Sequence, residues 1–252
     1  MPESHLRFDF EGQTAIVTGG TRGIGRAVAE AFLNAGGRVV AVYRSNTEEA
    51  DAFSKANRRF GDNLQIRQCD VSSSEETEAF YKSLENDDIV FQTLVHCAGI
   101  RADSIVGLMK EEDWRNVLDA NLTGTFYMCK GAVQRLTRKR YGRLILITSP
   151  VGRIGFAGQS NYAATKAGQV AFMQSLCKEV AGRKITVNCV SPGFIDTDFI
   201  ADLPDEQKKA YLEMVPLKRF GDAKEVASCV LFLASGDASY ITGSVLEVTG
   251  GI

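Results

Sequence analysis

The segment TAIVTGGTRGIG, residues 14–25, joins an apolar run, a glycine-rich turn and the start of a helical pattern. Glycines in such a turn permit a tight bend and let the main chain approach a phosphate closely. The amino terminus of the following helix supplies N–H donors and a positive dipole. We therefore predict a dinucleotide-binding loop rather than a simple turn, with cofactor contacts from Gly19, Thr21, Arg22, Gly23, Ile24 and Gly25.

Short β-branched runs alternate with helical patterns along the rest of the chain. The expected strands cover residues 14–18, 38–43, 64–69, 90–97, 143–148, 185–190 and 245–248. The expected helices cover residues 24–34, 47–60, 74–84, 110–136, 159–181 and 223–234. This alternation predicts a parallel sheet with right-handed crossovers, covered by helices on both faces. The fold class is therefore α/β, with a single Rossmann-type doubly wound domain over residues 1–252 and a seven-stranded parallel sheet.

Composition argues against several classes of protein. With 252 residues, 44% hydrophobic and 24% charged, the chain can bury a core without disulfides or metals. A net charge of −2 gives no electrostatic reason to expect nucleic acid or an anionic membrane as partner. No apolar run reaches the ~20 residues that span a bilayer. Residues 1–10 lack the pattern of a signal peptide, so we expect a cytoplasmic protein.

The cysteines and histidines give no sign of a metal centre. The six cysteines form no C-x-x-C pair and lie mostly in apolar segments, which is typical of reduced core residues. The two histidines, His5 and His96, are too few and too far apart for a zinc site. We predict no metal.

A second segment, residues 149–166, carries the candidate chemistry. Tyr162 and Lys166 are four residues apart in a proline-free stretch, so on a helix they share one face. The ammonium would favour phenolate and lower the pKa of Tyr162 towards working pH, where a general acid is most effective. Ser149 ends an apolar run, and its hydroxyl at that strand end could hold a carbonyl oxygen. The alternative is an ordinary surface pair of Tyr and Lys.

The end of the second strand favours one nicotinamide cofactor. NAD-binding chains usually place a carboxylate there for the ribose 2′-hydroxyl. This strand ends in AVYRS, residues 41–45, without an acid, while Arg44 and Arg22 are available. A guanidinium binds a 2′-phosphate through paired hydrogen bonds, which favours NADPH/NADP+. A solvated Arg44 is the alternative.

Two further strand ends carry possible cofactor contacts. Asp70 follows the third strand, where it could accept from the adenine amino group or cap the helix expected at 74–84. Gly99 follows the fourth strand, where the absent side chain would let the backbone pass close to the ribose.

Together these motifs resemble the short-chain dehydrogenase/reductase family over essentially the whole chain. They occur in the family's order: TGGTRGIG at 18–25, Asp70-Val71, Ala98-Gly99, Asn121, Ser149, Tyr162-x-x-x-Lys166 and Pro192-Gly193. Within the family, the chain is most similar to the 3-oxoacyl-(acyl-carrier-protein) reductases of fatty-acid synthesis. The supporting stretches are residues 18–26, 98–103, 161–168, 192–198 and 232–243.

The resemblance implies roles for individual residues. Tyr162 would give a proton to the substrate carbonyl as hydride arrives from NADPH, and Lys166 would lower the pKa of that tyrosine and hold the nicotinamide ribose. Ser149 would hydrogen-bond the carbonyl, and Asn121 would hold a water that links Lys166 to solvent. The other implied cofactor contacts are Val71, Ala98, Pro192, Gly193, Ile195, through its N–H, and Thr197.

The same resemblance implies two kinds of protein partner. An acidic acyl-carrier protein would dock on Arg140 and Arg183, beside the mouth of the active site. The alternative is that these cations merely complement helix dipoles. Relatives are mostly tetramers, and small residues along the 159–181 helix would let a second copy pack closely. We expect a homotetramer.

Some positions depart from the family pattern or leave its details open. Cys97 replaces a common Asn and cannot make the same side-chain hydrogen bonds. Pro150 restricts Ser149 to extended backbone and would reshape the substrate pocket. Residues 202–216, within a wider segment at about 194–216, form either a mobile lid or a plain surface helix.

These observations leave one leading function and two alternatives. The leading function is NADPH-dependent reduction of 3-oxoacyl-(acyl-carrier-protein) to the 3-hydroxyacyl form. The nearest alternative is a reductase of the same fold for another carbonyl substrate, such as an acyl-CoA, a polyketide or a sugar. A nucleotide-sensing protein without turnover is disfavoured, because the Ser, Tyr, Lys and Asn set is complete.

Overall fold

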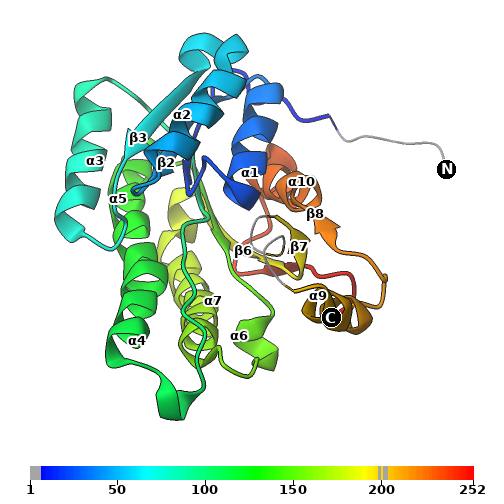
Figure 1. Cartoon of the computed structure of the whole chain (residues 1–252). Coiled ribbons are helices and arrows are strands. Elements are labelled where there is room, and N and C mark those ends of the chain that lie inside the picture. The colour runs from blue at the N-terminus through cyan, green and yellow to red at the C-terminus, as the bar shows by residue number, and fades with distance from the viewer. Residues whose placement is uncertain (1–6, 198–199, 201–203) are drawn as a thin grey trace.

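The computed structural model describes residues 7–197, 200 and 204–252 (Figure 1). The prediction that residues 1–10 are not a signal peptide falls partly on residues 1–6, which lie outside the described residues. Residues 198–199 and 201–203 of the predicted lid segment also lie outside them.

The centre of the fold is one parallel sheet of seven strands in the order β3-β2-β1-β4-β5-β6-β9. This confirms the predicted Rossmann-type α/β fold. The order reverses between β1 and β4, which is where open α/β sheets bind their ligands. The strands are β1 (Thr14–Thr18), β2 (Arg38–Tyr43), β3 (Leu64–Gln68), β4 (Thr93–His96), β5 (Gly142–Ile147), β6 (Ile185–Pro192) and β9 (Val245–Val248).

Helices cover both faces of the sheet, as Figure 1 shows. In β5, Leu144 and Leu146 join one apolar cluster, whereas Ile145 and Ile147 join the other, as the two-residue period of a strand requires. One cluster packs on α3 (Ser74–Asn86), α5 (Gly124–Lys139) and α7 (Ser160–Val180). The other packs on α1 (Gly23–Asn34), α2 (Thr47–Ala56) and α10 (Ala223–Ala234).

The predicted helix at 110–136 is divided in the structure. It consists of α4 (Glu111–Leu118), a π-helical turn over Asp119–Thr123, and α5. A π turn widens a helix locally and often marks a functional position. Asn121 lies within it.

Several short elements were not predicted. They are α6 (Val151–Ile154), the paired strands β7 (Ile195–Asp196) and β8 (Gly221–Asp222), and single turns at Arg58–Asn63, Val106–Leu108, Ala181–Arg183 and Gly236–Ala238. Helix α9 (Asp205–Met214) matches one of the two alternatives given for residues 202–216, a surface helix. Within the described part of the chain, no helix is both long and apolar enough to cross a membrane. All six cysteines are free thiols, and four of them are buried.

Candidate active site

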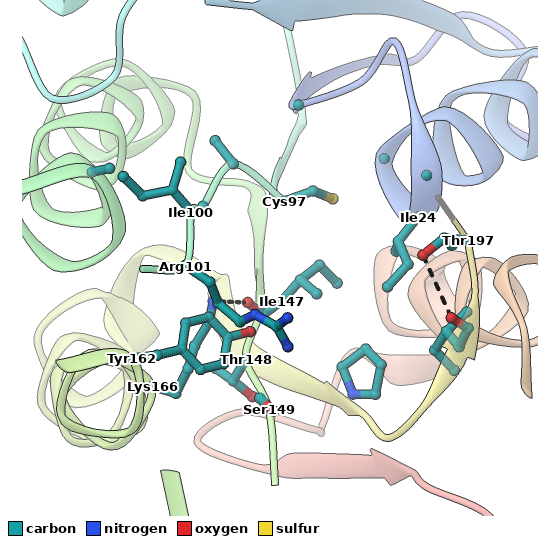
Figure 2. Close-up of a pocket in the computed structure, with 18 of the residues that line it drawn as sticks. Ile24, Cys97, Ile100, Arg101, Ile147, Thr148, Ser149, Tyr162, Lys166 and Thr197 are labelled. Atoms are coloured by element: carbon teal, nitrogen blue, oxygen red, sulfur yellow. Dashed lines mark hydrogen bonds between the residues drawn. The ribbon is translucent and has the colours of Figure 1, made fainter. Parts of the chain in front are cut away.

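A cavity of about 770 Å³ opens at the carboxyl ends of the strands (Figure 2). Every residue predicted to contact the cofactor lines it, although these residues come from segments far apart in the chain. They are Gly19, Thr21, Arg22, Gly23, Ile24, Gly25, Arg44, Asp70, Val71, Ala98, Gly99, Tyr162, Lys166, Pro192, Gly193, Ile195 and Thr197. Ser149 lines the same cavity.

The glycine loop leaves no room for side chains where the backbone folds on itself. A Cβ on Gly25 would lie 2.1 Å from the main-chain oxygen of Gly19. Gly19 and Gly23 have φ values of +63° and +51°, in the left-handed region that favours glycine. Arg22 caps α1 without a side-chain hydrogen bond, so the first N–H groups of the helix face the cavity edge as anion donors. This loop fits the pyrophosphate of a dinucleotide.

The end of β2 places one cation, Arg44, and no acid at the cavity. The residues that line the cavity there are Val42, Tyr43, Arg44, Ser45 and Asn46. The main-chain oxygen of Arg44 accepts a hydrogen bond from the Gln68 amide at 2.9 Å, while its side chain is exposed. The fixed backbone and free guanidinium suit recognition of a phosphate at this rim.

Asp70 does not cap the following helix, so that alternative is wrong. The cap of α3 is Ser73, whose side chain accepts from the Glu76 N–H. Asp70 Oδ1 instead accepts from the N–H and the hydroxyl of Ser72, at 2.9 and 2.7 Å. Asp70 also lines the cavity, and its contact with adenine stays a prediction.

Main-chain bonds to Thr18 compensate for the cysteine at position 97. The buried Thr18 hydroxyl oxygen lies 3.1 Å from the N–H groups of both Cys97 and Ala98 and accepts from them. The same hydroxyl lies 2.9 Å from Nδ1 of His96, which is also buried. Burial lowers the pKa of His96 to about 3. The ring is therefore neutral, and its contact with the Thr18 hydroxyl joins β1 to β4 beneath the cavity.

Ser149 and Tyr162 are brought together by the packing of α6 on α7. Pro150 is the residue from which α6 begins, so a short helix follows Ser149 immediately. The restriction of Ser149 to extended backbone stays a prediction. Gly152 lets this helix lie against α7, because a Cβ there would be 2.6 Å from the Ala167 nitrogen. A side-chain hydrogen bond with Ser149 lowers the pKa of Tyr162, but burial is the larger effect and raises it to about 12.

The Lys166 ammonium donates its hydrogen bonds to groups other than the Tyr162 hydroxyl. It donates to the main-chain oxygen of Ile147 at 2.9 Å and to Gln169 Oε1 at 3.0 Å (Figure 2 shows the first bond). It lies 5.4 Å from the centre of the Tyr162 ring. Burial lowers the pKa of Lys166 to about 8. Burial raises the pKa of Tyr162 and the Arg101 cation lowers it, so the low pKa expected for this phenol is not seen here. The role of Lys166 in lowering that pKa stays a prediction.

Asn121 does not line the cavity but braces it. Its side chain accepts from the Ile100 N–H at 2.8 Å and donates to the Ile100 carbonyl at 3.0 Å. The main-chain carbonyl oxygen of Asn121 accepts from the Thr125 hydroxyl at 2.6 Å and from Gln169 Nε2 at 3.1 Å. The Gln169 amide thus connects Asn121 to Lys166 directly. The water implied by the family resemblance stays a prediction.

Gln169 was missed in the sequence, although a signal was present. It follows Lys166 by three residues on the same helix, so both side chains lie on one face. The residue is fully buried and satisfies its amide with Lys166, Asn121 and Thr125. A polar residue at this spacing beside a catalytic lysine is a candidate partner.

An aromatic wall on the substrate side was also missed. The rings of Phe194 and Tyr211 are stacked with centroids 4.5 Å apart, and Phe156 meets Tyr211 edge-on at 5.7 Å. All three line the cavity. Tyr211 belongs to α9, so part of the predicted lid segment is a helix that presents a ring to the site. Such a wall suits an apolar substrate chain.

Arg140 and Arg183 are not beside the mouth of the cavity in the same chain. Arg140 ends α5 two residues before β5, and Arg183 lies two residues before β6. Both therefore lie at the amino edge of the parallel sheet, whereas Ser149 follows the carboxyl end of β5. Within one chain the two arginines are therefore distant from the cavity, because a helix that precedes a parallel strand ends at the far edge. Their role in docking a carrier protein stays a prediction.

Comparisons with known proteins agree with this geometry. A family model described as Enoyl-(Acyl carrier protein) reductase matches residues 19–252. The chain is 43% identical to the 3-oxoacyl-(acyl-carrier-protein) reductases FabG of Vibrio cholerae and Escherichia coli, over 97% of this chain and 98% of each relative. It is 40% identical to that of Aquifex aeolicus, over 98% of this chain and the whole relative. The protein therefore belongs to the short-chain dehydrogenase/reductase family of nicotinamide-dependent oxidoreductases.

Proposed function

We propose that this protein reduces a 3-oxoacyl thioester on acyl-carrier protein to the 3-hydroxyacyl thioester in fatty-acid synthesis, with NADPH as reductant. The observation that carries this proposal is that one cavity is lined both by the glycine-rich loop, residues 19–25, and by Ser149, Tyr162 and Lys166. The names of the relatives supply the substrate class. The description of the family model names an enoyl reductase, which reduces a C=C bond. The relatives, which align along nearly the whole chain, are named 3-oxoacyl reductases, and the proposal follows their names.

When bound, NADPH supplies the hydride that the carbonyl carbon accepts. Tyr162 is a phenol at neutral pH because burial keeps its pKa high, so it holds the proton that the developing alkoxide requires. Ser149 stands at hydrogen-bonding distance from that hydroxyl and can donate to the same substrate oxygen. Lys166 holds positive charge beside the ring and is placed to meet the nicotinamide ribose.

The preference for NADPH over NADH rests on two arginines. Arg22 and Arg44 are exposed and line the adenosine end of the cavity. Paired guanidinium hydrogen bonds to a 2′-phosphate are stronger than neutral ones, and a ribose hydroxyl offers them no negative charge.

Docking of the carrier protein on Arg140 and Arg183 is compatible with the fold if the enzyme is a homotetramer. Within one chain the two arginines and the cavity lie at opposite edges of the sheet. A two-fold axis that packs α4, α5 and α7 antiparallel against their copies would bring one subunit's arginines towards the partner's cavity. Exposed residues on these helices suit such packing: Trp114, Phe126, Ala164, Ala167 and Ala171.

We also propose that residues 194–216 act as a substrate lid of one domain spanning 1–252, in a cytoplasmic enzyme. Phe194 and Tyr211 support the first part, because both line the substrate side of the cavity. The six free thiols suit a reducing compartment.

The test is NADPH oxidation with acetoacetyl-acyl-carrier-protein, then with acetoacetyl-CoA, with NADH as the control cofactor. We expect the carrier-bound substrate with NADPH to be reduced fastest, and Arg140→Glu to remove the advantage of the carrier while the CoA rate stays. Rates for both thioesters near background, with tight NADPH binding, would contradict the substrate assignment. The reaction would then belong to another carbonyl compound, such as a polyketide or a sugar.

A further inference from the structure

Arg101 brings a positive charge to the reacting end of the cavity, a charge that the mechanism above does not use. It follows β4 by a few residues and lines the same cavity as Ser149 and Tyr162. Figure 2 shows its guanidinium beside the hydroxyl end of the Tyr162 ring, with Ser149 close by. The side chain is 24% exposed, so the charge is only partly screened by water.

A short chain of polar groups connects this guanidinium to the residue that precedes α7. Arg101 Nε lies 3.4 Å from Asp103 Oδ1. The other oxygen of Asp103 accepts from Gln159 Nε2 at 2.9 Å. Gln159 is 5% exposed and stands directly before α7, the helix that carries Tyr162.

The loop around Arg101 is also bonded to α7 through its backbone. Asn161, which is fully buried, donates to the Ala102 carbonyl at 2.9 Å. The Ser104 N–H donates to the Gly158 carbonyl at 2.8 Å. On the other side, Asn121 holds both polar groups of the Ile100 backbone. Arg101 and Tyr162 therefore form one preorganised unit, as an electrostatic catalytic site requires.

A guanidinium donates hydrogen bonds and cannot accept them, so its ligand must be an oxygen with available lone pairs. In the proposed reaction, Tyr162 and Ser149 bind the oxygen of the reacting carbonyl. A 3-oxoacyl thioester carries a second carbonyl oxygen two carbons away, on a chain that can turn both oxygens to the same side. A simple ketone has no such acceptor.

We propose that Arg101 binds the thioester carbonyl oxygen of the substrate and so selects 1,3-dicarbonyl compounds over simple ketones, an inference that rests on the proposed reduction of 3-oxoacyl thioesters. The oxygen belongs to the acyl group, so the same contact serves a carrier-bound and a CoA-bound thioester. Arg101 also lowers the pKa of Tyr162, an effect that reaches every substrate equally. The ratio of rates for two substrates therefore isolates the oxygen contact.

The experiment compares kcat/KM for acetoacetyl-CoA and for a cyclic ketone with a single carbonyl, both with NADPH. We expect Arg101→Met to lower the value for the thioester about 10- to 100-fold more than the value for the ketone, because one charged hydrogen bond is lost. Arg101→Lys should restore part of the difference. The matched control is Arg153→Met: Arg153 is 61% exposed, pairs with Glu247 at 3.1 Å, and does not line the cavity.

Equal losses for the two substrates in Arg101→Met would overturn the inference and leave the proposed function standing. If this variant does not fold, Asp103→Asn keeps the guanidinium but removes the charge that orients it. That variant should show a smaller loss, again confined to the thioester, and an unchanged ratio would refute the contact. A wild-type enzyme that reduces the ketone but no acetoacetyl thioester, or that reduces neither, would contradict the proposed function itself.

Discussion

Replacing Gln169 with leucine tests the buried network that holds the catalytic lysine. Gln169 supplies one of the two oxygens that accept from the Lys166 ammonium, at 3.0 Å, and the Ile147 carbonyl supplies the other. Leucine has a similar volume but no acceptor. Gln169 is fully buried, so the structure offers no ready replacement from solvent.

The size of the effect follows from the chemistry of that bond. A hydrogen bond to a charged group contributes about 1.5–3 kcal/mol, and about 1.4 kcal/mol corresponds to one pKa unit. Loss of an acceptor disfavours the charged form, so the pKa of Lys166 should fall by about one to two units from its value of about 8. In the variant, the lysine would be largely neutral at pH values where it is charged in the wild type.

The assay is the pH dependence of kcat/KM for NADPH-dependent reduction of acetoacetyl-CoA. This quantity reports groups of the free enzyme, and its alkaline limb should follow the loss of the Lys166 proton. In Gln169→Leu we expect that limb to move to lower pH by about one to two units. The control is Gln174→Leu, on the exposed side of the same helix. An unmoved alkaline limb in a folded Gln169→Leu enzyme would refute this account of the network.

Three further substitutions test the cofactor loop and the sheet beneath it. Gly25→Ala places a methyl group 2.1 Å from the Gly19 oxygen, so the loop must shift. Fluorescence titration should then show NADPH affinity lowered more than tenfold, and unchanged affinity would contradict the role of this loop in binding the cofactor. Arg44→Ser should raise KM for NADPH about tenfold with little change for NADH, and equal effects on both would exclude a 2′-phosphate contact. Thr18→Val removes the acceptor for two N–H groups and the hydrogen-bond partner of His96 Nδ1, so chemical denaturation should show a loss of about 2–4 kcal/mol in the free energy of unfolding. A loss below about 0.5 kcal/mol would contradict that role.

The cofactor side of the site could be predicted from sequence because its determinants are local. A glycine turn lies between a strand and a helix by the order of residues alone, as Gly19 and Gly25 do. The ends of parallel strands meet at one edge, which brings Asp70, Gly99 and Ser149 to one cavity once the alternation is recognised. The strand and helix positions followed from the same pattern.

The substrate side depends on contacts that the chain order does not reveal. Tyr162 and Lys166 share a helix face, yet the ammonium turns to a strand carbonyl and to Gln169 rather than to the phenol. The cation near the phenol is Arg101, from a loop some sixty residues earlier in the chain. These directions are decided by tertiary packing and by the need of each buried polar group for a partner.

The position of Arg140 and Arg183 could have been predicted better. A helix that connects two parallel strands runs back across the sheet, so its last residues lie at the amino edge. Both arginines end such helices or the turns after them. The expectation that they lie beside the cavity came from the family resemblance and not from the order of the strands and helices.

The most direct test of the central claim is the variant Tyr162→Phe, measured for NADPH affinity and for reduction of an acetoacetyl thioester. General acids contribute about 10²- to 10⁴-fold to such reactions, so kcat should fall within or beyond that range. The dissociation constant for NADPH should change little, because the lost hydroxyl faces the substrate. A variant that keeps more than a tenth of the wild-type kcat would contradict the assignment of Tyr162 as the proton donor, and with it the reaction proposed for this site.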